Sequence, residues 1–316
     1  MSVSKQTNKD YLLLFFKGAG MGAADVVPGV SGGTIAFITG IYQRLLNAIQ
    51  SVNLEAAKLL FQKGSLINNI KSLWQHIDGN FLLAVFSGLL TSAISLAKII
   101  TFMLANHPIY VWSFFFGLII ASFIHIAKQV ETWNIKTILS CIFGAVLAFT
   151  ITTLSPTDVE PQWWYYTAAG AIAICAMILP GISGSFILLL LGMYAHVLSA
   201  VNSLAFDLIF LFITGCIIGL MAFSRVLTWL LKHYHQITFA LLSGFLVGSL
   251  NLLWPWKQVL TTYTNSKGII KPLSQKNILP DTFLQLTGQD PKQVTAISLM
   301  LFGLLLILFI EKLSKK

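Results

Sequence analysis

The sequence predicts an all-α integral membrane protein made of two tandem repeats with inverted topology. Each predicted repeat is a broken, re-entrant helical hairpin followed by three transmembrane helices. Three observations predict this fold class. Of the 316 residues, 56% are hydrophobic and only 10% are charged, whereas soluble domains have about 25% charged residues. Six long apolar stretches alternate with polar segments, and a motif rich in proline and glycine occurs twice.

The transmembrane helices are predicted from the length of the apolar stretches. The hydrocarbon core of a bilayer is about 30 Å thick and needs roughly 20 apolar residues per helix. Stretches that meet this requirement are residues 81–105, 109–127, 136–154, 207–231, 236–254 and 293–312. Two more apolar stretches, residues 11–49 and 163–201, are interrupted by clusters of Pro, Gly and Ser, and each predicts a broken hairpin. The first apolar run lacks a small-x-small cleavage site, so we expect no removable signal peptide.

The two halves of the sequence repeat one another. The segment that starts at Pro28 (PGVSGGTIAFITGIYQRLLNAI) aligns with the segment that starts at Pro180 (PGISGSFILLLLGMYAHVLSAV) at a separation of 152 residues. Separations of 127 and 159 residues align Gly88 with Gly215, Lys98 with Arg225, Gly117 with Gly244 and Gly144 with Gly303. We therefore predict repeat 1 over residues 1–155 and repeat 2 over residues 156–316, within a single membrane domain.

The arrangement of each repeat predicts its orientation. A hairpin that returns to its starting side, followed by three spans, crosses the bilayer an odd number of times. Two such units in tandem must therefore have opposite orientations. Inverted repeats with broken helices are typical of secondary transporters, which bind their substrate near the midplane where the repeats meet. This feature favours transport over catalysis.

The distribution of charge indicates a topology rather than a nucleic-acid partner. The formal net charge is +9, but the basic residues are scattered through loops between the apolar stretches. By the positive-inside rule, four groups of lysines mark the cytoplasmic side: those up to Lys17, those between residues 58 and 71, Lys128 with Lys136, and those after residue 311. The acidic loop 155–162 marks the other side, so we expect both termini in the cytoplasm. The long loop 255–292 has five lysines and opposes this assignment, although long loops constrain topology less.

Two polar segments lie outside the predicted spans. Residues 54–75 mix apolar residues and lysines at roughly helical spacing, which predicts an amphipathic helix in the cytoplasmic interface. Residues 255–292 contain four prolines with little periodicity, which predicts a folded or partly mobile external loop. Neither segment predicts a separate soluble domain.

The repeated motif predicts a break in each hairpin. Proline removes a backbone donor and glycine permits tight turns, so Pro28, Gly29, Pro180 and Gly181 are the predicted breaks. A half-helix that begins near Ser31 would present free N–H groups at membrane depth, and such a helix N-terminus suits an anion. The candidate phosphate-binding residues at the two tips are Ser31, Gly32, Gly33, Thr34, Ser183, Gly184 and Ser185. The alternative is that these small residues only permit close helix packing.

Ionisable residues within spans are functional candidates because burying them in lipid is costly. Arg225 and its counterpart Lys98 would approach opposite faces of the bilayer and could pass a phosphate across; alternatively, both could extend to the nearer interface. Arg44, whose counterpart is His196, follows the first half-helix and is a further candidate phosphate ligand or a cytoplasmic anchor. Asp25, replaced by Met177 in the other copy, could carry a coupling proton, form an ion pair or cap a helix.

The sequence offers no recognisable catalytic or metal-binding motif. HExxH and P-loop patterns do not occur. The three cysteines, Cys141, Cys175 and Cys216, lie in apolar stretches without CxxC spacing, so neither a disulfide framework nor a metal site is expected. We expect no catalytic residue, no metal and no cofactor, with coupling to protons or to the membrane potential as an open possibility.

The first motif, KGAGMGAADVVPGVSGGTIAFITGIYQRL, and its echo, ILPGISGSFILLLLGMY, resemble a bacterial membrane family. This family, once known only as a domain of unknown function, is described as polyprenyl-phosphate (undecaprenyl phosphate) transporters, and the resemblance covers nearly the full chain. The resemblance implies return of undecaprenyl phosphate, the lipid carrier of cell-wall synthesis, across the bacterial cytoplasmic membrane. By this analogy residues 25–34, Arg44 and residues 183–185 belong to the functional core.

Together these observations predict a flippase that works by alternating access. The head group would enter from the outer leaflet, bind the two tips together with Arg225 or Lys98, and leave inward as the repeats rock. The expected partners are a lipid-phosphate substrate and membrane lipids, possibly a second copy of the chain, and no nucleic acid. One alternative is a transporter or channel for a small inorganic anion, which would have a closed axial pore. A membrane-embedded lipid phosphatase is less well supported because it needs a nucleophile or a metal cluster.

Overall fold

The computed structural model describes residues 7–27, 30–60, 65–154, 156–157, 159–264 and 270–314. The predicted hairpin-break residues Pro28 and Gly29 lie outside the described residues. The first half of the chain contains α1 (Asn8–Asp25), α2 (Gly32–Ile38), α3 (Tyr42–Ser51), α4 (Leu54–Leu60), α5 (Leu66–His76), α6 (Gly79–Asn106), α7 (Pro108–Ala127) and α8 (Ile135–Thr153). The second half contains α9 (Trp163–Ile178), α10 (Gly184–Leu190), α11 (Tyr194–Asn202), α12 (Phe206–His233), α13 (His235–Leu253), β1 (Lys257–Thr264), β2 (Ile270–Asn277), α14 (Pro280–Thr287) and α15 (Gln293–Ser314).

The predicted class of helical membrane protein is confirmed. Among the described residues, five helices are long and apolar enough to span a membrane: α6, α7, α8, α12 and α13. The pair α10 and α11, bent by 107°, would make a sixth span if counted as one. The predicted span 293–312 falls within α15, whose apolar part Gln293–Phe309 is shorter than the other spans.

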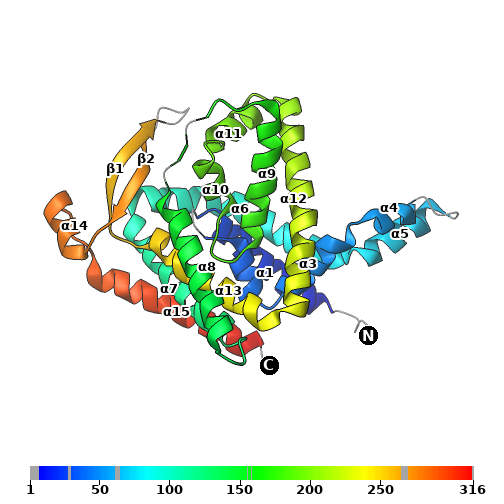
Figure 1. The fold of residues 1–316 in the computed structure, drawn as a ribbon, viewed down its shortest axis with the longest axis horizontal. Coiled ribbons are helices and arrows are strands. Elements are labelled where there is room, and N and C mark those ends of the chain that lie inside the picture. Colours follow the sequence, from blue (N-terminus) through cyan, green and yellow to red (C-terminus); the bar gives the residue numbers. More distant parts are fainter. Residues whose placement is uncertain are drawn as a thin grey trace.

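Two segments differ from their predicted structure. Residues 54–75 form two helices, α4 and α5, rather than one, and they project from the rest of the protein as an arm (Figure 1). Residues 255–292 contain an antiparallel hairpin of β1 and β2 followed by α14, at the opposite end of the molecule (Figure 1). The β1 segment KQVLTTYT is rich in β-branched and aromatic residues that favour strands. The sequence nevertheless predicts a loop here, because the four prolines of residues 255–292 are unfavourable in strands.

The broken hairpin of each half packs on the first long helix of the same half through glycine. A Cβ atom on Gly88 of α6 would overlap the carbonyl group of Phe15 on α1. In the second half, a Cβ atom on Gly215 of α12 would overlap the carbonyl group of Thr167 on α9. Small residues let membrane helices approach this closely. The two contacts are equivalent, since Thr167 follows Phe15 by 152 residues and Gly215 follows Gly88 by 127.

The later helices pack across the two halves. On α7, Gly117 lies against the carbonyl group of Met300 on α15, and on α13, Gly244 lies against the carbonyl group of Cys141 on α8. These contacts are also equivalent, at the separations of 127 and 159 residues found in the sequence. Each half therefore contributes one helix to each of these two pairs, and the halves interlock.

Candidate functional site

The N-terminus of α2 is closed by groups of the protein itself. Ser31 precedes the helix in an extended conformation, and its hydroxyl accepts a hydrogen bond from the N–H of Gly33 at 3.1 Å. The carboxylate of Asp25 accepts one from the N–H of Gly32 at 2.6 Å. The N–H of Thr34 donates to the carbonyl oxygen of Ser31 at 2.9 Å. Three of the donors that a helix N-terminus normally leaves free are therefore occupied.

The two predicted hairpin tips touch each other. The hydroxyl of Ser31 donates to the carbonyl oxygen of Met177 at 2.7 Å, and the phenol of Tyr42 donates to that of Ile178 at 3.0 Å. In return, the N–H of Gly181 donates to the Thr34 hydroxyl at 3.0 Å. Hydroxyl groups of the first half thus satisfy carbonyl groups at the C-terminal end of α9, which a helix end leaves without partners.

Glycine is required at this contact because backbone lies directly opposite. A Cβ atom on Gly33 would lie 2.6 Å from the carbonyl oxygen of Ile178 and 3.0 Å from that of Met177. A Cβ atom on Gly184 would lie 2.7 Å from the carbonyl oxygen of Ala173. Gly181 has φ of +85°, a conformation that favours glycine. The small residues of both motifs therefore do serve close packing, as the alternative interpretation held, and they also bring the tips together.

The N-terminus of α10 differs from that of α2. The hydroxyl of Ser183 pairs with that of Ser185 at 2.8 Å and caps no N–H group. Within the described parts of the chain, the N–H groups of Gly184 and Ser185 have no acceptor in hydrogen-bonding geometry. Ser183 and Gly184 are buried, whereas Ser185 is partly exposed. This second tip therefore keeps free donors that α2 has already used.

Asp25 acts as a cap and forms no ion pair with any described residue. Its Oδ1 atom binds the N–H of Gly32, while its Oδ2 atom is buried and has no described hydrogen-bond partner. A carboxylate at a helix N-terminus is stabilised by the helix dipole. Of the three roles considered for Asp25, the helix cap is present, the ion pair is absent among the described residues, and proton coupling stays a prediction.

Arg44 is held by a partner that the sequence did not indicate. Its guanidinium group forms two hydrogen bonds with the carboxylate of Asp78, at 2.7 Å and 3.0 Å. The same group lies over the ring of Phe81, 4.3 Å from its centre. Asp78 has a left-handed conformation just before α6, 34 residues from Arg44 along the chain. Arg44, predicted as a phosphate ligand, is thus engaged in an ion pair.

We expect this ion pair to stabilise the connection between α3 and α6 rather than to bind substrate. Replacing Arg44 with Gln, Asp78 with Asn, or both should lower the free energy of unfolding by similar amounts, with a coupling of about 1 kcal/mol or less because both side chains are partly exposed. A double-mutant cycle on detergent-solubilised protein measures this. Binding of a phosphate ligand should fall equally in all three variants. A much larger fall for Arg44→Gln than for Asp78→Asn would restore Arg44 as a ligand.

Lys98 and Arg225 occupy equivalent, exposed positions. Each lies 19 residues after the first residue of its helix, Gly79 of α6 or Phe206 of α12. Neither has an ion-pair partner among the described residues. The glycine contacts show that α6 runs parallel to α1 and α12 runs parallel to α9. Extending this register puts Lys98 close to the level where α1 ends, and Arg225 close to the level where α9 ends.

Two lysines that the sequence indicated only as topology markers are held by the fold. Lys17 lies within α1, and its ammonium group donates to the carbonyl oxygen of Thr39 at the end of α2 at 2.7 Å. A cation at that end stabilises the helix dipole. Lys257 donates to the carbonyl oxygen of Leu252 and lies over the ring of Trp112. Burial lowers the pKa of Lys257 to about 7, so this lysine is a weaker topology marker than its sequence position suggested.

Comparisons with known proteins identify the family of the chain. A sequence model of the family described as undecaprenyl phosphate translocase-like matches residues 21–271. A polyprenyl-phosphate transporter of Vibrio cholerae is 48% identical over 307 residues, which cover 97% of this chain and 98% of that protein. A polyprenyl-phosphate transporter of Staphylococcus aureus is 31% identical over 257 residues, which cover 76% of this chain and 84% of that protein. No solved structure matches the chain.

Proposed function

The chain belongs to the undecaprenyl phosphate translocase-like family, and from this premise we propose that it moves polyprenyl phosphate across the bacterial cytoplasmic membrane. The Vibrio cholerae relative, named a polyprenyl-phosphate transporter, is 48% identical over almost the whole chain. The five or six apolar spans found among the described residues suit a substrate whose isoprenoid tail remains in lipid. The proposed role is the return of the lipid carrier for reuse.

The observation that carries the proposal is the open tip of α10 beside the closed tip of α2. The free N–H groups of Gly184 and Ser185 and the hydroxyl groups of Ser183 and Ser185 can donate to phosphate oxygens. Arg225 is exposed near the level of this tip, so it can pair with a phosphate that approaches from the lipid. A head group bound in this way keeps its tail outside the protein.

The state of the α2 tip indicates how the phosphate moves on. The carboxylate of Asp25 holds the N–H of Gly32, the position that a phosphate oxygen would take. Two anions cannot share this tip without strong repulsion. We therefore assign the structure to a state in which α10 is open to substrate and α2 is blocked. Protonation or displacement of Asp25 would open α2 in turn.

Two inverted repeats remain our proposal for the architecture that links these states. Its support is the recurrence of glycine contacts at constant separations, both within each half and across the halves. In the proposed mechanism, α1 and α6 move as one unit, and α9 and α12 move as a second. Both units move against the interlocked pairs α7 with α15 and α8 with α13. Lys98 and Arg225 then receive the head group at the level of the two tips, Lys98 near the end of α1 and Arg225 near the end of α9, with both termini in the cytoplasm.

Proteoliposomes that contain the purified protein test the proposed role of Arg225. Replacing Arg225 with Gln should slow translocation of undecaprenyl phosphate about tenfold, because a charge-assisted contact with phosphate contributes about 1.5–3 kcal/mol. Arg225→Lys keeps the charge and should retain most of the rate. Lys136→Gln, which removes an exposed charge from the first turn of α8, is the matched control. Equal rates for Arg225→Gln and Lys136→Gln would refute this role.

A further inference from the structure

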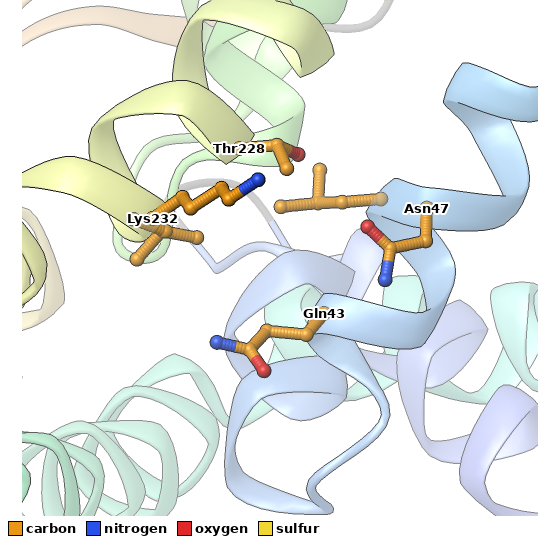
Figure 2. A pocket seen from close by; sticks show the side chains of 6 residues that line it. Gln43, Asn47, Thr228 and Lys232 are labelled. Carbon is orange, nitrogen blue, oxygen red and sulfur yellow. The ribbon is translucent and has the colours of Figure 1, made fainter. Parts of the chain in front are cut away.

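A groove lies between α3 and α12. Its volume is about 240 Å³, and its lining residues are Gln43, Leu46, Asn47, Thr228, Leu231 and Lys232. The groove adjoins the C-terminal end of α12, near the arm of α4 and α5 (Figure 1). Figure 2 shows the ammonium group of Lys232 reaching from α12 into the space between the helices, with the amide group of Asn47 directed toward it from α3.

The lining of the groove suits an anion with an apolar tail. Leu46 and Leu231 are 1% and 5% exposed and form an apolar floor. Lys232 and the two amide side chains supply a positive charge and several N–H donors, while none of the six lining residues is acidic. The hydroxyl oxygen of Thr228 is buried and has no described hydrogen-bond partner. These features together favour a ligand with several anionic oxygen atoms.

A hydrogen bond between α3 and α12 holds the groove together. One turn beyond Thr228, towards the start of α12, the carbonyl oxygen of Ser224 accepts a hydrogen bond from the side chain of Gln50 at 2.6 Å. This bond joins α3 to α12 beside the groove. Binding therefore requires little ordering of the protein, and ordering is the cost that weakens binding to flexible surfaces.

Comparison of the two halves shows which lining residues the fold itself requires. At separations of 152 residues on α3 and 127 on α12, three positions keep their residue type: Leu46 with Leu198, Thr228 with Thr101 and Leu231 with Leu104. Three positions do not: Gln43 with Ala195, Asn47 with Ser199 and Lys232 with Ala105. The packing residues thus occur in both halves, whereas the positive charge and the amide groups occur on one side only. Polar residues that occur in only one half are expected where that half binds a ligand, because packing alone does not require them.

We propose that the groove between α3 and α12 is a second phosphate-binding site, which holds the phosphate head group of the lipid substrate after or before it occupies the tips. This inference rests on the proposed function. A volume of 240 Å³ is below the roughly 300–1,000 Å³ of pockets that enclose a drug-sized ligand. It accommodates the phosphate and the adjoining part of the isoprenoid tail. The rest of the tail lies in the bilayer. Because the equivalent positions of the other half lack these polar residues, the site serves only one face of the membrane.

The test is the binding of farnesyl phosphate to the full-length protein in nanodiscs, with inorganic phosphate and farnesol as comparison ligands. Native mass spectrometry counts the bound molecules, and titration gives the affinity. Lys232→Gln should weaken binding of farnesyl phosphate at the groove about tenfold and remove one bound molecule. Asn47→Leu should have a smaller effect in the same direction. Lys232→Arg should restore binding, and Lys136→Gln should bind as the unaltered protein does.

Each outcome of this test is informative. Unchanged affinity and stoichiometry in Lys232→Gln would overturn the proposal. Equal binding of inorganic phosphate at the groove, lost in Lys232→Gln, would make it a free-anion site and also overturn the lipid assignment. Translocation is measured separately in proteoliposomes. Loss of farnesyl phosphate from the groove of Lys232→Gln therefore supports the site even if translocation by the unaltered protein fails, which would refute only the proposed function.

Discussion

Replacing Gly33 with alanine is expected to slow translocation of polyprenyl phosphate by at least about tenfold. The new Cβ atom would lie 2.6 Å from the carbonyl oxygen of Ile178 and 3.0 Å from that of Met177. Both neighbours are backbone atoms, so the N-terminus of α2 must move away from the end of α9. This movement breaks the 2.7 Å hydrogen bond from Ser31 to Met177. Misplacement of a binding group by about 1 Å can cost up to about a hundredfold in rate.

A glycine of α1 supplies the matched control for this substitution. A Cβ atom on Gly20 would meet only a side-chain methyl group of Ile35, at 3.2 Å, which can shift by a few tenths of an ångström. Gly20→Ala should therefore translocate at nearly the unaltered rate. Expression and unfolding midpoint in detergent must be compared for both variants. Equal rates for Gly33→Ala and Gly20→Ala would show that the contact between the tips does not matter for transport.

The second large effect is expected at Asp25. Asp25→Ala removes the acceptor of the Gly32 N–H and should slow translocation about tenfold, because a buried unpaired donor costs about 1–3 kcal/mol. Asp25→Asn keeps an oxygen that can accept this bond but removes the negative charge. Without the like charge, the α2 tip should bind a lipid phosphate more tightly than it does in the unaltered protein.

The same substitution predicts a change in pH dependence. As the pH falls, Asp25 takes up a proton and stops repelling the phosphate, so affinity in the unaltered protein should rise; as the pH rises, affinity should fall. The phosphate itself also titrates. The affinity of Asp25→Asn for the lipid phosphate should therefore still depend on pH, but less steeply than that of the unaltered protein. Farnesyl phosphate titrations across the acidic to neutral range measure the difference. Asp281→Asn, at an exposed carboxylate in the first turn of α14, is the control. Parallel pH profiles for all three proteins would contradict a role for the Asp25 charge.

The asymmetry between the tips shows where sequence reasoning reaches its limit. The two motifs align so well that the sequence predicts equivalent tips, yet only α2 is closed by its own side chains. The difference arises from Asp25, whose counterpart is Met177, and from Ser185, which pairs with Ser183 and whose counterpart is Gly33. The substitutions are visible in the alignment. Their consequence depends on hydrogen-bond geometry, which spacing alone does not reveal.

Other parts of the structure were predictable to different degrees. The long helices followed from apolar length, because a membrane imposes both a minimum length and internal hydrogen bonding. The pairing of Arg44 with Asp78 could not be foreseen, since 34 residues and two intervening helices separate them. The polar side of the α3 and α12 groove was equally hidden, because Lys232 directly follows the predicted span 207–231 and is far from Asn47 along the chain. Long-range contacts of this kind need the packed structure.

The most direct test of the central claim follows undecaprenyl phosphate and inorganic phosphate in parallel through proteoliposomes that contain the unaltered protein. The proposed function predicts that the lipid crosses much faster than in protein-free liposomes, that inorganic phosphate does not, and that Gly33→Ala abolishes most of the difference. Movement of inorganic phosphate without movement of the lipid would contradict the claim and favour a small-anion transporter.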